Sequence, residues 1–119
     1  MRGVNKTIIV GTAGQDPDFR EFDDGSVCNL QVATNEVWKD KKSGEERSHT
    51  EWHRLVFRNR LAEIAFEYIK KGSKIYIEGR NRTRSYESEG VTRYVTEIIV
   101  SDLQLLDSPN KEHYTDQDQ

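Results

Sequence analysis

The stretch from Thr50 to Tyr86 constrains the fold more than any other part of the chain, because its hydrophobic period changes twice. Residues up to Arg58 fit a period of two, the next dozen fit a period near 3.6, and the period of two returns after Gly72. These periods indicate a strand and a helix respectively. The stretch therefore predicts a strand, a helix capped by Asn59 and Gly72, and a second strand.

Both strands of this stretch carry an apolar face and a face that mixes aromatic rings with basic side chains. Alternation points His53, Leu55 and Phe57 inward. The outward residues are Trp52, Arg54, Val56 and Arg58, followed by Lys74, Tyr76, Glu78, Arg80, Arg82, Arg84 and Tyr86. Arginines on an exposed sheet also occur merely because they keep it soluble. The interleaved rings favour nucleic acid, since a single strand requires cations for phosphates and flat surfaces for unstacked bases.

The rest of the chain supplies three more strands, at residues 5–10, 27–37 and 93–106. The core-facing positions expected on the first two are Ile8, Val10, Cys28, Leu30 and Val32. Trp38 shares the parity of the second set, so we expect a bulge or twist to turn it outward. The order predicts an all-β chain with one helix: a five-stranded oligonucleotide-binding (OB) barrel with the helix between strands 3 and 4.

Length and composition set limits on this fold. The 119 residues suffice for one domain, placed at 1–106, and the acidic tail at 107–119 is expected to be disordered. No run of 18 apolar residues and no signal peptide is found, so we expect no membrane partner. With Cys28 alone and three scattered histidines, the sequence predicts no metal, no cofactor and no disulfide. A buried free thiol is typical of a reducing, cytoplasmic setting.

The net charge of −3 argues against a polyanionic partner only until its distribution is considered. Four acids against one lysine after Leu106 account for the whole −3, so residues 1–106 are neutral overall. Basic residues are concentrated in the central stretch, and local potential rather than the total steers a polyanion. The net charge therefore does not exclude nucleic acid.

The chain resembles a known family, the bacterial and phage-type single-stranded DNA-binding proteins. The resemblance covers residues 2–106 and rests on a series of motifs in order. These are R-G-V-N-K at 2–6, V-G at 10–11, D-P at 16–17, T-E-W-H-R at 50–54, L-A-E at 61–63, K-G-S-K-I-Y-I-E-G at 71–79, R-T-R at 82–84 and R-Y-V-T-E-I at 93–98. The resemblance implies an OB-fold homotetramer that coats single-stranded DNA in replication, recombination and repair.

The resemblance also implies roles for individual residues. Trp38 and Trp52 stand where the family carries two base-stacking tryptophans, and Tyr86 stands where many members have another. Arg58 stands where members commonly have a stacking phenylalanine; here the ring is at Phe57, which faces inward by alternation. The long linker and hydrophobic tip usual in the family are absent, so this looks like a short form. Replication or repair proteins stay possible partners under the resemblance, but without the docking tip that the family usually provides.

Together these observations predict sequence-nonspecific binding and protection of single-stranded DNA. No nucleophile–base pair or paired carboxylates suggest an enzyme. The expected DNA-binding residues are Trp38, Trp52, Arg54, Arg58, Lys74, Arg80, Arg82, Arg84 and Tyr86. His53 and Ile8 are expected at the subunit interface of a homotetramer. The alternative is an OB-fold accessory module that docks replication or primosome proteins, and salt-dependent binding to poly(dT) separates the two.

Overall fold

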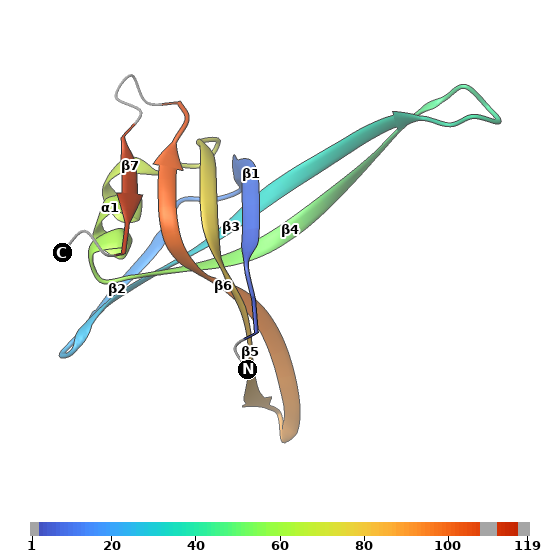
Figure 1. Cartoon of the computed structure of the whole chain (residues 1–119). Coiled ribbons are helices and arrows are strands. Elements are labelled where there is room, and N and C mark those ends of the chain that lie inside the picture. Colours follow the sequence, from blue (N-terminus) through green and yellow to red (C-terminus); the bar gives the residue numbers. More distant parts are fainter. Residues whose placement is uncertain (1–2, 108–111, 117–119) are drawn as a thin grey trace.

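The computed structural model describes residues 3–107 and 112–116, and consists mostly of strands (Figure 1). Its elements are β1 (Thr7–Ala13), β2 (Asp18–Phe22), β3 (Gly25–Lys39), β4 (Glu46–Arg58), α1 (Arg60–Tyr68), β5 (Lys74–Ser88), β6 (Val91–Leu105) and β7 (His113–Thr115). Strands β3, β5 and β6 have 15 residues each, which exceeds the usual length of about 5–6. They are long because one part of each strand belongs to the barrel and the other part to a projecting ribbon.

Five of the strands close into a ring. The sheet order is β1-β5-β6-β4-β3, and β1 also pairs with β3 through Thr12↔Ala33 and Ala13↔Val32. The β4–β6 pairing is parallel and the other four in the ring are antiparallel. Helix α1 falls between the third and fourth ring strands, and β2 extends the sheet beyond β3. The five-stranded OB barrel predicted from the sequence is confirmed.

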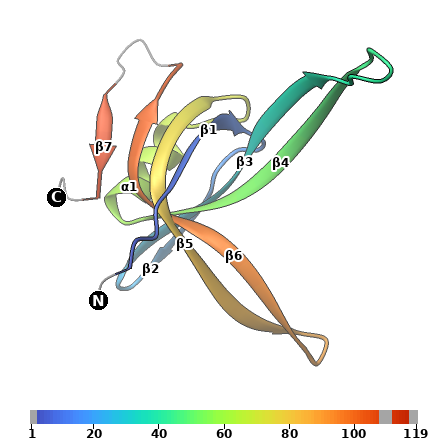
Figure 2. The ribbon, with the colours of Figure 1, turned by 45° about the vertical axis from the view of Figure 1, so that its right-hand side comes forward.

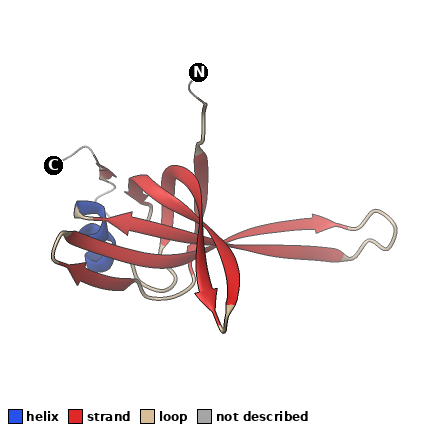
Figure 3. Cartoon of the chain, turned by 90° about the horizontal axis from the view of Figure 1, so that it is seen from below, coloured by secondary structure: helices blue, strands red, loops and turns tan. Residues whose placement is uncertain are grey.

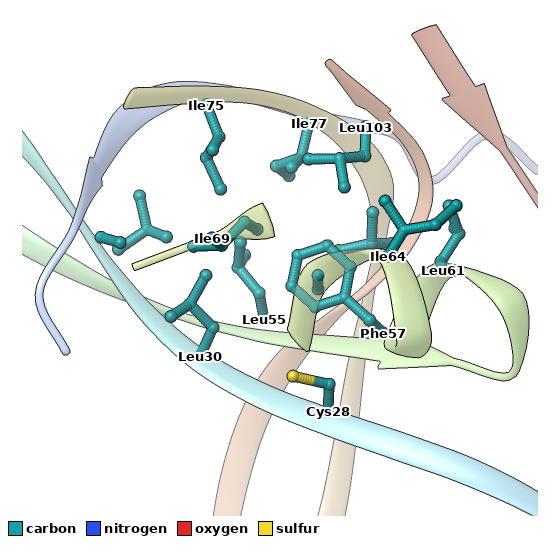
Figure 4. Packing of buried hydrophobic residues seen from close by; sticks show 14 of the residues in the cluster. Cys28, Leu30, Leu55, Phe57, Leu61, Ile64, Ile69, Ile75, Ile77 and Leu103 are labelled. Carbon is teal, nitrogen blue, oxygen red and sulfur yellow. The ribbon is translucent and has the colours of Figure 1, made fainter. Parts of the chain in front are cut away.

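The barrel interior is filled by the alternating residues of these strands and by one side of α1 (Figure 4). Cys28, Leu30, Val32, Leu55 and Phe57 are buried, as alternation predicts. So are the helix residues Leu61, Ile64 and Ala65. The helix ends earlier than expected, at Tyr68 rather than at Gly72, which leaves Tyr68 exposed. Ile69, in extended conformation just after the helix, takes the inward place instead.

The inward face of β1 was predicted wrongly. Ile8 is 56% exposed and Val10 is also exposed, whereas Ile9 is only 5% exposed. The run Thr-Ile-Ile-Val is apolar at both parities, so alternation alone does not choose a face. Pairing makes the choice, because Ile9 lies opposite the buried Ile77 of β5.

Beyond the barrel, β3–β4 and β5–β6 continue as two-stranded ribbons that diverge from one another (Figures 2 and 3). The β3–β4 register runs without a shift from Val27↔Arg58 to Lys39↔Glu46. Of the bulge or twist that we expected at Trp38, the bulge is therefore not present. Trp38 shares the parity of the core residues but lies where the ribbon has left the barrel, so 47% of its surface is exposed.

A bulge marks the place where the β5–β6 pair leaves the barrel. Glu78 pairs with Asp102 but Gly79 pairs with Val100, so Ser101 is an extra residue on β6. The backbones approach closely here: a Cβ on Gly79 would lie 2.4 Å from the carbonyl oxygen of Ile99. A bulge increases local twist, which redirects the ribbon away from the ring.

Part of the C-terminal segment is ordered, although the whole of residues 107–119 was expected to be disordered. His113–Thr115 form β7, which pairs antiparallel with β6 through Asp102↔Thr115, Leu103↔Tyr114 and Gln104↔His113. Tyr114 packs against the core cluster, and His113 Nε2 lies 3.2 Å from Asp102 Oδ1. Composition misses this strand because one ring and a short edge pairing supply its stability. The remaining tail residues, 108–111 and 117–119, lie outside the described structure.

Candidate nucleic-acid interface

The sheet register brings charged residues from three strands into one row on the outer face of the barrel. Leu55 of β4 pairs with Ile98 of β6, and both side chains point into the core. The preceding residues, Arg54 and Glu97, therefore lie side by side on the outside. Glu97 also pairs with Arg82 across the β5–β6 ladder. A cation, an anion and a second cation thus follow one another across neighbouring strands.

Glu97 holds a further arginine in a fixed position. Arg84 Nε donates to Glu97 Oε1 at 2.9 Å and Nη2 donates to Oε2 at 3.3 Å, which is the bidentate geometry of a strong pair. The hydrogen bond that Arg84 donates to this carboxylate raises the pKa of the arginine, so Arg84 stays charged. Its guanidinium carbon lies 6.0 Å from the centre of the Tyr86 ring, within cation–π range. Arg84 is therefore oriented by a carboxylate on one side and a ring on the other.

Trp52 lies on the same face of β4 as Arg54, and 57% of its surface is exposed. Its ring rests against Gly14, where the chain leaves β1. A Cβ on Gly14 would lie 2.3 Å from Cζ3 and 2.8 Å from Cη2 of the indole. Only glycine allows this approach, so Gly14 defines where the exposed ring sits.

A polar depression of about 220 Å³ lies between these groups, at the junction of the barrel and the β5–β6 ribbon. Its lining is Gln15, Asp18, Asn29, Leu30, Gln31, Arg54, Leu55, Arg84 and Glu97. Three carboxamides, two guanidinium groups and two carboxylates thus converge on one space. Such a surface can both donate and accept hydrogen bonds.

The other predicted residues are placed at varying distances from this depression. Arg80, Arg82 and Tyr86 are exposed along β5, on the face predicted by alternation. Arg58 is exposed at the end of β4, two steps along the same face from Arg54. Lys74 lies at the other end of β5, twelve residues or on the order of 40 Å along the strand from Tyr86. The structure does not bring Lys74 to the rest of the group.

The two tryptophans lie on different faces of the β3–β4 ribbon. Trp52 pairs with Ala33 and Trp38 pairs with Arg47, five register positions further out. Because an odd number of steps separates them, the two rings start from opposite sides of the pleat. A nucleic-acid strand that contacts both rings must therefore follow the twist of the β3–β4 ribbon or cross its edge.

Sequence reasoning missed Gly14, Gln15 and Glu97 as members of this surface. Glu97 carried a usable signal, since it is an acid directly before the apolar run Ile98-Ile99-Val100. In the structure it is only 9% exposed. The contact of Gly14 with Trp52 carried none, because 38 positions separate the two residues in the chain.

A separate depression of about 210 Å³ lies where residues of β1, β3 and β5 meet. It is lined by Val10, Gly11, Thr12, Ala33, Thr34, Asn35 and Lys74. His53 is half-buried at its margin, with a ring nitrogen 2.9 Å from the Thr34 hydroxyl. Ile8 lies two residues before Val10 on β1, and both side chains are exposed. This hydrogen bond orients the His53 ring, and its place at a subunit interface stays a prediction.

In the described part of the chain, no helix is long and apolar enough to cross a membrane. Within residues 3–107 and 112–116, no three side chains of His, Cys, Asp or Glu gather as a metal ion would require.

Comparison with known proteins decides the family. Residues 4–106 match the Single-strand binding protein family (SSB). The chain belongs to this family. A solved structure described as the Plasmodium falciparum SSB complex with ssDNA is similar to the chain, with a TM-score of 0.81 and 32% sequence identity. The match covers 90% of this chain and 98% of that one.

The SSB match confirms the resemblance that the motifs indicated. It extends over the whole barrel and both ribbons, which are the parts that carry the outer face described above. Proteins of the SSB family bind DNA without catalysing a reaction, in agreement with the prediction that this chain is not an enzyme.

Proposed function

We propose that the protein binds single-stranded DNA with little dependence on sequence, and protects it during replication, recombination and repair. The observation that carries the proposal is the continuous outer face of β4, β6 and β5, where Trp52, Arg54, Arg84 and Tyr86 are held together. The 32% identical Plasmodium SSB has been solved with single-stranded DNA, which supports the same ligand for this chain.

The mechanism combines two kinds of contact. Arginines on β4 and β5 neutralise phosphates and release counterions, so affinity falls as salt rises. Trp38, Trp52 and Tyr86 stack on unpaired bases, each worth about 1–3 kcal/mol whichever base is present. The ion pair with Glu97 prevents Arg84 from swinging freely, so less conformational entropy is lost when it meets DNA.

Assembly into a homotetramer belongs to the same proposal. The exposed Ile8 and Val10 lie on β1, and the free edge of this strand before Thr12 offers unpaired backbone groups. A second protomer would cover both, with His53 near the rim. We place the assembled protein in the cytoplasm, where Cys28 remains a free thiol.

A titration with oligo(dT) tests the proposal directly. Tryptophan emission should fall strongly as the rings stack, and the logarithm of the affinity should decline linearly with the logarithm of salt concentration. Duplex DNA of the same length is the control, because its stacked bases are not available to the rings. Binding that is absent, or that quenches equally with duplex DNA, would contradict the proposal and favour the alternative, an OB module that docks replication or primosome proteins.

A further inference from the structure

Glu97 is out of place on a surface that binds a polyanion. Its carboxylate is largely covered, yet it lines the polar depression together with Arg54 and Arg84. An anion here repels phosphate, so its position needs a reason beyond general affinity. Each carboxylate oxygen has two lone pairs, and Arg84 takes one on each oxygen. Glu97 can therefore still accept hydrogen bonds from a group in the depression.

Arg54 supplies the complementary donors. It lies beside Glu97 in the β4–β6 register and lines the same depression. Among the residues that the structure describes, it has no ion-pair partner, whereas Arg84 is held by Glu97. The Glu97 carboxylate therefore offers an acceptor, and the neighbouring guanidinium of Arg54 offers two donors.

This order of groups matches cytosine better than uracil, thymine or guanine. The Watson–Crick edge of cytosine offers the N4 amine as a donor, followed by the acceptors N3 and O2. A carboxylate accepts from cytosine N4, and a guanidinium donates to paired acceptors. Uracil and thymine have an oxygen at position 4, which would face the carboxylate and leave it without a hydrogen bond. Guanine offers two adjacent donors and one acceptor, the reverse of what the depression supplies.

We propose that this depression is a subsite that reads one unstacked cytosine, with Glu97 accepting from N4 and Arg54 donating to N3 and O2. The inference rests on the proposed function, because the base must arrive as part of a single strand. The Trp52 ring lies against Gly14, which precedes the lining residue Gln15 in the chain. The Tyr86 ring lies beside the lining residue Arg84. The rings hold any base, and Glu97 adds a local preference among them.

The test compares oligo(dC) with oligo(dU). Their bases differ at C4, which carries an amine in cytosine and an oxygen in uracil, and at N3, which carries a proton only in uracil. Neither base carries a methyl group. Affinities of the parent, Glu97→Gln and Glu78→Gln are measured at one salt concentration. Glu78 is the matched control, since it is also an ion-paired carboxylate, with Oε1 3.0 Å from Lys6 Nζ, but it lies on β5 outside the depression. Both variants lose one negative charge and should gain affinity for both strands alike.

Only Glu97→Gln should change the preference between the strands. A glutamine amide can accept from cytosine or donate to uracil, so the ratio of dC to dU affinity should fall about fivefold or more. Glu97→Asp keeps the charge but withdraws the carboxylate, and should lower the ratio without the general gain. It serves as the second variant if Glu97→Gln does not give a cooperative thermal melt.

The outcomes separate the two proposals. If the parent binds neither strand, the proposed function fails. If the parent binds both strands and the dC/dU ratio of the folded Glu97 variants equals that of the parent, DNA binding stands and cytosine reading by Glu97 is overturned. A ratio that falls equally in Glu78→Gln would overturn it as well, because the effect would then be one of charge alone.

Discussion

Replacing Gly14 with alanine should move the Trp52 ring while leaving the fold intact. The new Cβ would lie 2.3 Å from indole Cζ3, whereas ordinary contact begins near 3.4 Å, so this edge of the ring must retreat by at least about 1.1 Å. The atoms that must move form the far end of an exposed side chain. The free energy of unfolding should therefore change by no more than about 0.5 kcal/mol.

DNA affinity should respond more strongly than stability. Stacking on one aromatic ring is worth about 1–3 kcal/mol, which corresponds to roughly 5- to 150-fold in affinity. Trp52→Ala removes this contact, and Gly14→Ala displaces it. We expect a loss of about fivefold to tenfold for Gly14→Ala, and a larger loss for Trp52→Ala.

The assay is fluorescence anisotropy of a labelled oligo(dT), together with the tryptophan emission spectrum and a thermal melt of each variant. Gly3→Ala is the matched control, because a Cβ there meets nothing within 4 Å. A Gly14→Ala protein whose emission shows a displaced indole, but whose affinity equals that of the parent, would refute the placement of Trp52 in the DNA path.

Four further outcomes follow from the same structure. Arg58→Ala should weaken oligo(dT) binding by about 1 kcal/mol while Arg58→Phe preserves it with a flatter salt dependence; parent-like binding by the alanine variant at low and high salt would place Arg58 outside the DNA path. Light scattering should give a tetramer mass that Ile8→Asp reduces, and a monomeric parent at micromolar concentration would contradict the interface. Burial, aided by the charge of Asp18, raises the pKa of Cys28 to about 12, so a disulfide reagent at pH 8 should label it only after denaturation. Truncation after residue 107 should lower the melting temperature, since Tyr114 packs on the core, without reducing DNA affinity.

Much of the fold could be predicted because the hydrophobic period of two locates the strands, and the single stretch with a period near 3.6 places the helix between the third and fourth. The parity of Cys28, Leu30 and Val32 was unambiguous, since polar residues separate them. The parity of Ile8 and Ile9 was not, because neighbouring apolar residues satisfy either face until a partner strand is known. Local pattern identifies strands, and only pairing orients a uniformly apolar one.

The candidate site could be predicted only in part, for a related reason. Rings and cations on β4 and β5 follow from alternation within each strand. Their neighbours across the sheet depend on the parallel β4–β6 register, which no local pattern encodes. Glu97 therefore meets Arg54 and Arg84 only when the barrel closes. Trp38 shows the opposite failure: the alternation was correct, but the sequence did not reveal where the ribbon leaves the barrel.

The extra residue Ser101 fixes the phase of the whole outer half of β6. On its C-terminal side, odd-numbered residues such as Leu103 and Leu105 belong to the core, and on its other side the even-numbered Ile98 and Val100 do. Deleting this single residue would leave the strand with one phase throughout. Ile98 and Val100 would still face the core and Glu97 would still face outward, because the order of residues then alternates regularly from Leu105 back to Glu97. A one-residue deletion at this position would therefore keep the sidedness of the β5–β6 ribbon and change the direction in which the ribbon leaves the barrel, because the twist of the bulge would be lost.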